Sequence, residues 1–140
     1  MEKQVADASA VLAVILDESS ASDVRAASRD SELVAPGSLS WEVGNALVLG
    51  MREDRLPLEM ATAALREYQN VPIRTVPIER ADALEIADAE DIYPYDAYML
   101  TCAHRHSAPL LSLDLPLRSI ARTRGVALRP EVIEGDERYE

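Results

Sequence analysis

The sequence contains no phenylalanine, one tryptophan, one cysteine and no long apolar run. The core must therefore be built mainly from alanine, leucine and valine, and Cys102 cannot form an internal disulfide. The longest apolar stretch, residues 8–16, is far shorter than the roughly 20 residues of a membrane span, and it follows an acidic start rather than a basic one. We therefore expect neither a signal peptide nor a membrane anchor. We expect a cytoplasmic location.

Lysine and glycine are also scarce, and their scarcity excludes two classes of phosphate chemistry. The only lysine is Lys3, whereas phosphoaspartate proteins such as response-regulator receivers and haloacid-dehalogenase-like phosphatases need a lysine late in the chain. The five glycines form no Gly-x-Gly-x-x-Gly or Gly-Lys-Ser loop, so a nucleotide cofactor is unsupported.

Positive charge is the third deficit, because 25 acidic residues against 14 basic ones leave a net charge of −11. The basic surface that usually marks a nucleic-acid binder is missing. Part of the excess lies in residues 134–140, which we expect to form a disordered acidic tail. The 140 residues suit one domain, which we place at residues 1–133.

What the sequence does contain is a regular alternation of short apolar segments and helical patterns. We predict strands over residues 4–7, 33–35, 73–77, 109–112 and 126–128. We predict helices over residues 8–16, 23–29, 39–51, 57–69, 79–89, 94–106 and 116–124. This alternation predicts an α/β fold with a central parallel sheet covered by helices on both faces.

Four acidic residues stand where a strand or turn gives way to the first turn of a predicted helix: Asp7, Glu42, Asp96 and Asp114. Each by itself is explained by helix capping or by the positive end of a helix dipole. In a parallel sheet, however, such turns gather at one edge, where carboxylates far apart in sequence can converge on a metal ion. Their conjunction therefore indicates a site.

The short sequence segments around these acids resemble the ordered motifs of PIN-domain nucleases. The motifs are Asp7-Ala8-Ser9, Glu42 with Asn45 three residues later, Tyr95-Asp96-Ala97 and Ser112-Leu113-Asp114. The chain's size and the segments Val43-Gly44-Asn45-Ala46-Leu47 and Ala108-Pro109-Leu110-Leu111 resemble, within that group, VapC-type toxins of toxin–antitoxin pairs. The resemblance spans about residues 4–128.

The resemblance implies a three-layer α/β/α PIN-like domain and a Mg²⁺- or Mn²⁺-dependent endoribonuclease. It would hydrolyse RNA phosphodiester bonds with metal-activated water, and the four acids would be both the catalytic residues and the metal ligands. Hard carboxylate oxygens are the ligands that Mg²⁺ prefers. Ser9 and Ser112 would orient the acids or a water molecule, and Asn45 would steady Glu42 or touch the substrate.

The resemblance also implies a cognate antitoxin, and self-association into a homodimer is expected. The alternative is a catalytically weak PIN-like module that binds RNA or a protein without cutting. The net charge of −11 is consistent with that alternative.

Two arginines near the last acid have two interpretations. Arg118 and Arg122, four apart on one helical face, are possible RNA contacts near Asp114, and a solvated helix face explains them equally well. Leu115-Pro116 follows Asp114 where the family often has a basic residue.

Three other residue types have structural interpretations that we favour. Trp41, next to Glu42, could stack a base, but core packing is expected for the only tryptophan. Cys102 is expected to be a small packing residue. His104 and His106 lie near a predicted helix end, where imidazoles favour the helix dipole, so a metal role is not expected.

Overall fold

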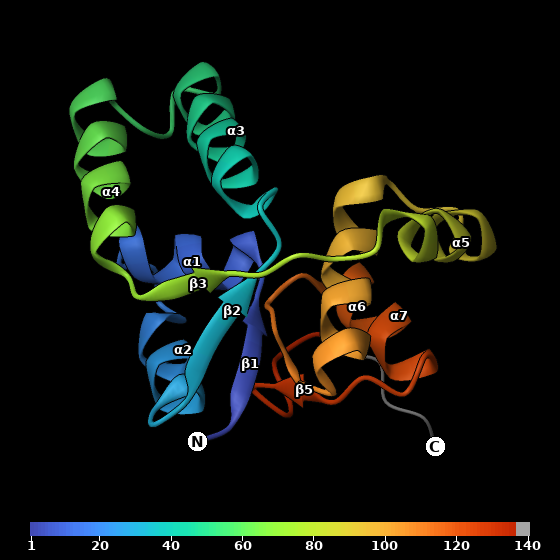
Figure 1. Cartoon of the computed structure of the whole chain (residues 1–140). Helices are drawn as coiled ribbons and strands as arrows, with labels where there is room; N and C mark the ends of the chain where they lie inside the picture. The colour runs from blue at the N-terminus through green and yellow to red at the C-terminus, as the bar shows by residue number, and fades with distance from the viewer. Residues whose placement is uncertain (137–140) are drawn as a thin grey trace.

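The computed structural model describes residues 1–136, which form five strands and seven helices (Figure 1). The strands are β1 (Lys3–Ala6), β2 (Glu32–Ala35), β3 (Ile73–Thr75), β4 (Leu110–Leu111) and β5 (Leu128–Arg129). The helices are α1 (Ala8–Ile15), α2 (Ala21–Ser28), α3 (Leu39–Arg52), α4 (Leu58–Asn70), α5 (Arg80–Glu90), α6 (Pro94–His106) and α7 (Leu115–Thr123). Each predicted element is present, with bounds displaced by a few residues.

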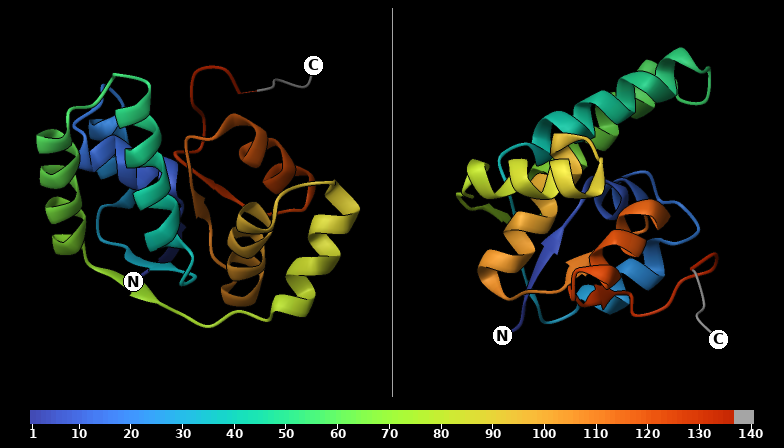
Figure 2. Two further views of the ribbon diagram at one scale, coloured as in Figure 1. Left: turned by 90° about the horizontal axis from the view of Figure 1, so that it is seen from above. Right: turned by 90° about the vertical axis from the view of Figure 1, so that its right-hand side faces the viewer.

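All five strands are parallel and lie in the order β3-β2-β1-β4-β5. The chain builds outward from β1 to one edge of the sheet, then crosses to the other side of β1 to add β4 and β5. Helices α1 and α2 lie on one side of the sheet, and α5, α6 and α7 lie on the other (Figure 2). The predicted three-layer α/β/α architecture is confirmed.

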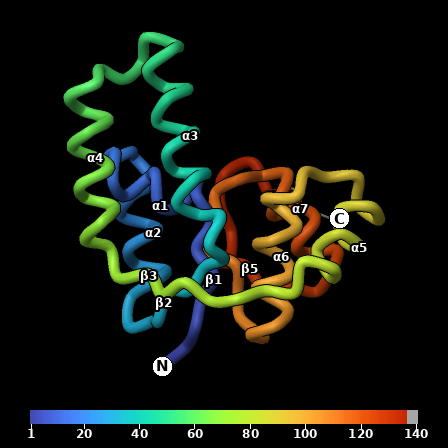
Figure 3. Tube along the Cα trace, turned by 45° about the horizontal axis from the view of Figure 1, so that its top comes forward, coloured from blue at the N-terminus to red at the C-terminus, as the bar shows by residue number. Residues whose placement is uncertain are grey.

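Helices α3 and α4 form an antiparallel pair that projects beyond the sheet, as the tube in Figure 3 shows. The pair contacts α1. Only the first turn of α3 therefore lies near the sheet, and that turn carries Glu42.

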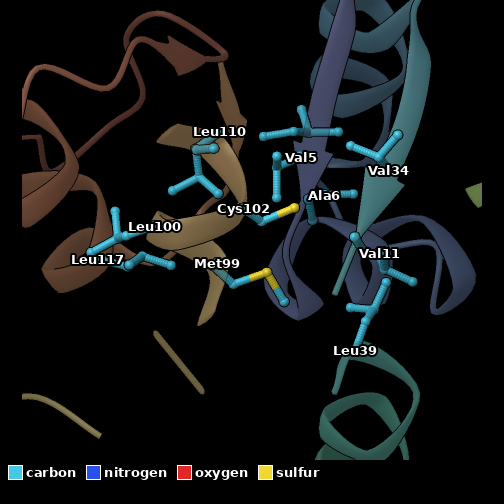
Figure 4. Packing of buried hydrophobic residues seen from close by; sticks show 14 of the residues in the cluster. Val5, Ala6, Val11, Val34, Leu39, Met99, Leu100, Cys102, Leu110 and Leu117 are labelled. Atoms are coloured by element: carbon cyan, nitrogen blue, oxygen red, sulfur yellow. The ribbon is translucent and has the colours of Figure 1, made fainter. Parts of the chain in front are cut away.

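The core is aliphatic and centres on β1, whose Val5 and Ala6 are fully buried. A central parallel strand is covered on both faces, which explains its continuous apolar sequence. Side chains of α6 pack against it, among them Met99 and Cys102 (Figure 4). Cys102 is a packing residue, as expected, and burial raises the pKa of its thiol to about 11. Such a thiol stays protonated and unreactive at neutral pH.

The C-terminal segment corrects the predicted domain boundary. Asp136 is not part of a disordered tail, because its carboxylate is 4% exposed and forms a salt bridge with Arg118. The ordered domain therefore extends beyond residue 133, at least to residue 136. The rest of the predicted tail, residues 137–140, lies outside the described residues. Within the described residues no helix is both long and apolar enough to cross a bilayer.

Candidate active site

Asp7 lies directly after β1 and caps the helix that follows. Its Oδ1 accepts the Ala10 N–H at 3.1 Å and the Ser9 hydroxyl at 2.6 Å, while its Oδ2 accepts the Ser112 hydroxyl at 2.6 Å. The side chain is buried, so these three bonds hold the carboxylate in one orientation. Within the described residues both oxygens accept from neutral donors, and no positively charged side chain bonds to them.

The sheet register places Ser112 opposite Asp7. Ala6, the last residue of β1, pairs with Leu111, the last residue of β4. Asp7 and Ser112 directly follow these two residues. The polar residues therefore meet where two neighbouring strands end. This is also where the strand order reverses, between β1 and β4, and ligands of open α/β sheets bind at such a point.

Two serine hydroxyls connect the ends of β1 and β4. Ser9 Oγ accepts the Leu113 N–H at 2.8 Å, and Ser112 Oγ accepts the Asp114 N–H at 3.1 Å. Since both hydroxyls donate to Asp7, each serine holds the acid and the loop after β4 at once. A shift of that loop would therefore move Asp7.

Asp114 caps α7, where its Oδ1 accepts the Leu117 N–H at 3.0 Å. Leu115 and Pro116, which depart from the family pattern, form the first turn of this helix. Proline is favoured there because its missing N–H is not needed for a helical hydrogen bond. The departure thus supports the helix that positions the acid.

Glu42 lies in the first turn of α3, and its nearest hydrogen-bond partner was not predicted. Ser38, four residues earlier, donates its hydroxyl to Glu42 Oε2 at 3.3 Å. Ser38 occupies the N-cap position of α3, but its side chain makes no capping bond. The i, i+4 spacing of Ser38 and Glu42 was the available signal. Asn45, predicted to steady Glu42, lies beside it in a shared cleft.

The acids repel one another. Burial raises the pKa of Asp7 from its ordinary 3.8 to about 6, against the lowering effect of its hydrogen bonds and with added repulsion from Asp114. Burial and the charges of Asp7 and Asp96 raise the pKa of Glu42 from 4.5 to about 7. Burial and the charge of Asp114 raise that of Asp96. The fold thus brings all four predicted acids into one electrostatic cluster.

Glu42 and Asp96 face a common cleft of about 600 Å³ between the starts of α3 and α6. Trp41, Tyr93 and Tyr95 line the same cleft. Trp41 is 76% exposed, so the expectation that it packs in the core is wrong. Its position on α3 turns it away from the sheet, because the buried face of the helix begins at Leu39 and Val43.

The two arginines predicted as possible RNA contacts are both paired with Asp136. Arg118 is fully buried, and its guanidinium donates to both Asp136 oxygens and to the Ser112 carbonyl. It cannot reach RNA, and the alternative of a solvated helix face is wrong as well. Arg122 is 28% exposed and also bridges Asp136, at 3.0 Å. The sequence analysis missed Asp136 because eighteen residues and a turn separate it from Arg118.

Comparison with known proteins places this geometry in a family. The sequence matches the profile of the PIN domain over residues 5–123. The chain belongs to the PIN-domain family. A solved structure of PAE2754 from Pyrobaculum aerophilum is similar, with a TM-score of 0.68 and 20% identity over 91% of this chain and 90% of that one. At this identity the likeness concerns the fold alone. A search of curated proteins found no match.

PIN domains are generally nucleases that act on nucleic acid with the help of divalent metal ions. Within residues 1–136, no three acidic, histidine or cysteine side chains lie close enough together to ligate one ion directly. The donor chemistry nevertheless fits a hard cation, because Mg²⁺ is bound through one or two carboxylates and keeps several of its waters. Raised carboxyl pKa values also indicate negative charge that a cation would stabilise.

Proposed function

We propose that this PIN domain is a metal-dependent endoribonuclease whose catalytic residues and metal ligands are Asp7, Glu42, Asp96 and Asp114. The observation that carries the proposal is the immobilised Asp7, which two serines hold at the strand-order reversal within a cluster of mutually repelling acids. A fold retains such unfavourable charge where function needs it, because buried like charges cost stability.

In this site a bound Mg²⁺ or Mn²⁺ would activate a water molecule and stabilise the charge that develops on the phosphate. The chain's own residues supply the placement. Ser9 and Ser112 fix the orientation of Asp7, and the capping bond fixes Asp114 at the start of α7. Glu42 and Asp96 line the cleft through which the substrate backbone would approach.

A cleavage assay over a panel of structured RNAs, such as tRNAs and ribosomal stem-loops, tests this function. We expect purified protein, freed of any partner, to cut at least one RNA in Mg²⁺ or Mn²⁺ and to stop when a chelator is added. The Asp7→Asn and Asp96→Asn variants serve as controls for a contaminating nuclease. Equal cleavage by wild type and both variants would falsify the proposal.

We further propose that the protein is the toxin of a toxin–antitoxin pair. The sequence segments that resemble VapC-type toxins support this role, and the acidic cluster favours a partner that inserts an arginine among the carboxylates. A small antitoxin should then co-purify with the chain and inhibit cleavage. If the neighbouring genes encode no small DNA-binding protein and no chain co-purifies, the toxin role has lost its support.

A homodimer is proposed as the working oligomeric state, and sedimentation of the purified protein would test it. The competing function is a PIN-like module that binds RNA or protein without cutting, which the net charge of −11 favours. The assay separates the two, since a binding module retains RNA in a gel shift but releases no metal-dependent fragments.

A further inference from the structure

Aromatic side chains are rare in this chain and concentrate at one place. The sequence has one tryptophan and five tyrosines, and three of these six residues line the cleft beside Glu42 and Asp96. Trp41 is 76% exposed, Tyr93 is 83% exposed and Tyr95 is 50% exposed. In a chain without phenylalanine, leaving the largest aromatic ring in solvent forgoes the most apolar burial that one side chain offers.

The rings are tied to the acids by the chain itself. Trp41 directly precedes Glu42 in the first turn of α3, and Tyr95 directly precedes Asp96 in the first turn of α6. Two separate helices therefore present the same pair, a ring followed by a carboxylate, to one cleft of about 600 Å³. Anything that approaches the acids through the cleft passes these rings.

One of the rings is held in place. Tyr95 packs edge to face against Tyr98, with ring centroids 6.1 Å apart and an interplanar angle of 75°. Tyr98 is itself half-buried and packs against the core. The exposed ring of Tyr95 is thus anchored before any ligand arrives, which lowers the entropy lost on binding.

The side chains that line this cleft supply no positive charge for substrate affinity. Its eight lining residues within the described chain include no lysine or arginine, and the chain as a whole carries a net charge of −11. The arginine that lies nearest in sequence to the Ser112 loop is buried against Asp136. Stacking between a base and an aromatic ring needs no positive charge, and every nucleobase has a face on which a ring can stack.

We propose that Trp41, Tyr93 and Tyr95 form a stacking surface for unpaired nucleobases of the RNA that the neighbouring acids cleave. This inference rests on the proposed function and names the side chains that would hold the bases of its substrate. In a duplex the bases are already stacked on one another and do not offer their faces. A hairpin loop or an unpaired end would lay its bases on the rings and its backbone toward Glu42 and Asp96.

Trp41 is the only tryptophan of the chain, so its fluorescence reports on the cleft alone. The Asp7→Asn protein, with and without Mg²⁺, is titrated with a short unpaired oligoribonucleotide, with the duplex of the same sequence and with an abasic ribose-phosphate strand. We expect the unpaired strand to quench the emission in a saturable manner. The duplex and the abasic strand should leave the emission nearly unchanged.

Four substitutions separate stacking from general apolarity. Trp41→Leu and Tyr95→Leu should weaken binding of the unpaired strand about tenfold each, as expected for the loss of one stacked base. Binding by the variants is measured by fluorescence anisotropy of an end-labelled strand, because Trp41→Leu removes the only tryptophan. Tyr95→Phe keeps a ring and should bind like the parent. Leu84→Ala removes an exposed apolar side chain of α5 outside the cleft and should have no effect. Circular dichroism melts verify that each variant folds.

Equal quenching by duplex and unpaired strand, no quenching under either condition, or full affinity in Trp41→Leu would each overturn the inference. A shift of Trp41 emission with protein concentration in the absence of RNA would also overturn it, because the rings would then be covered by a second copy. Cleavage without quenching would leave the nuclease in place and remove the stacking surface. Quenching without cleavage would support the stacking surface and reject the nuclease.

Discussion

Buried carboxylates occur on both sides of Ser112, at Asp7 and at Asp136, and their surroundings are opposite in sign. Asp136 accepts two bonds from Arg118, at 2.8 and 2.7 Å, and is bridged by Arg122. These guanidinium groups hold its pKa well below the usual range. Asp7 accepts only neutral donors, and burial, with a smaller contribution from the charge of Asp114, raises its pKa to about 6.

Ser112 links the two regions. Its hydroxyl donates to Asp7, while its carbonyl accepts from Arg118 Nη1 at 2.9 Å. The Arg118–Asp136 ion pair therefore stabilises the backbone at Ser112, whose hydroxyl holds Asp7. One buried acid serves the structure because its charge is matched, and the other leaves charge unmatched at the site where we propose that a cation binds.

The largest expected effect is on stability, from Asp136→Asn. This substitution leaves Arg118 buried without its counter-charge, and breaking a buried pair costs about 3–5 kcal/mol. Urea unfolding at pH 7 measures the loss. The double variant Arg118→Met with Asp136→Leu should recover much of it, and Glu53→Gln, in an exposed ion pair with Arg55, should change little. A neutral Asp136→Asn variant would contradict the matched-charge interpretation.

Asp7→Asn should act in the opposite direction on stability while abolishing activity. The rise in pKa from 3.8 to about 6 corresponds to an electrostatic cost of up to about 3 kcal/mol at neutral pH, which asparagine avoids. The variant should therefore unfold at equal or higher urea concentration in chelator. Cleavage should fall by more than about 100-fold, since even residues that only support a metal ligand contribute about 10- to 100-fold. Loss of both activity and stability would indicate a structural role for Asp7.

The two regions should also respond oppositely to pH. Asp7 and Glu42 have raised pKa values, so the native state binds more protons than the unfolded state between about pH 4 and pH 7, and this contribution to stability falls as pH rises through that window. Asp136 has a lowered pKa, so its contribution is present above about pH 4 and is lost as pH falls further.

Denaturant unfolding in chelator at several pH values from about 4 to 8 measures this dependence. We expect a shallower decline toward neutral pH in Asp7→Asn, and a smaller loss of stability on acidification in Asp136→Asn. Identical pH profiles for wild type and both variants would refute the assignment of these charges.

The smallest effect is expected from Ser112→Ala. The variant loses the bond that the hydroxyl donates to the Asp7 carboxylate and the bond it accepts from the Asp114 N–H, at a cost of about 2 kcal/mol. The pKa of Asp7 should rise further because the Ser112 hydroxyl lowers it. Cleavage should fall about tenfold through the altered orientation of Asp7. Carboxyl NMR titration and initial rates provide the two readings. Ser28→Ala, which loses a serine hydrogen bond on α2, is the matched control and should leave both unchanged.

Much of the architecture was predictable because its causes are local. Strand and helix periods, the proline at the start of α6 and the acidic caps of α1 and α7 are all visible over a few residues. The four acids were found by the same signal, since each stands at a helix start. Their convergence was an inference from the parallel sheet, which the structure now gives as β3-β2-β1-β4-β5.

The misplaced residues share a different cause. Arg118 was interpreted from its charge and its helical face, and Trp41 from being the only tryptophan, but the exposure of both depends on contacts with distant segments. Arg118 is paired with Asp136 in the C-terminal turn, and Trp41 lies on an exposed side of α3. Side-chain chemistry alone favoured an exposed arginine and a buried tryptophan, and both were reversed.

The succession of strands and helices along the chain, and the four acids at helix starts, follow from short-range periodicity and capping chemistry, which act within a few residues. Which charges are matched depends on the three-dimensional fold. Asp136 meets Arg118, and Asp7 meets Ser112 across 105 positions of the chain, because a parallel register and a C-terminal turn bring them together. Short sequence segments cannot predict these pairings between distant residues, since burial and electrostatic coupling arise from the packing of the whole domain.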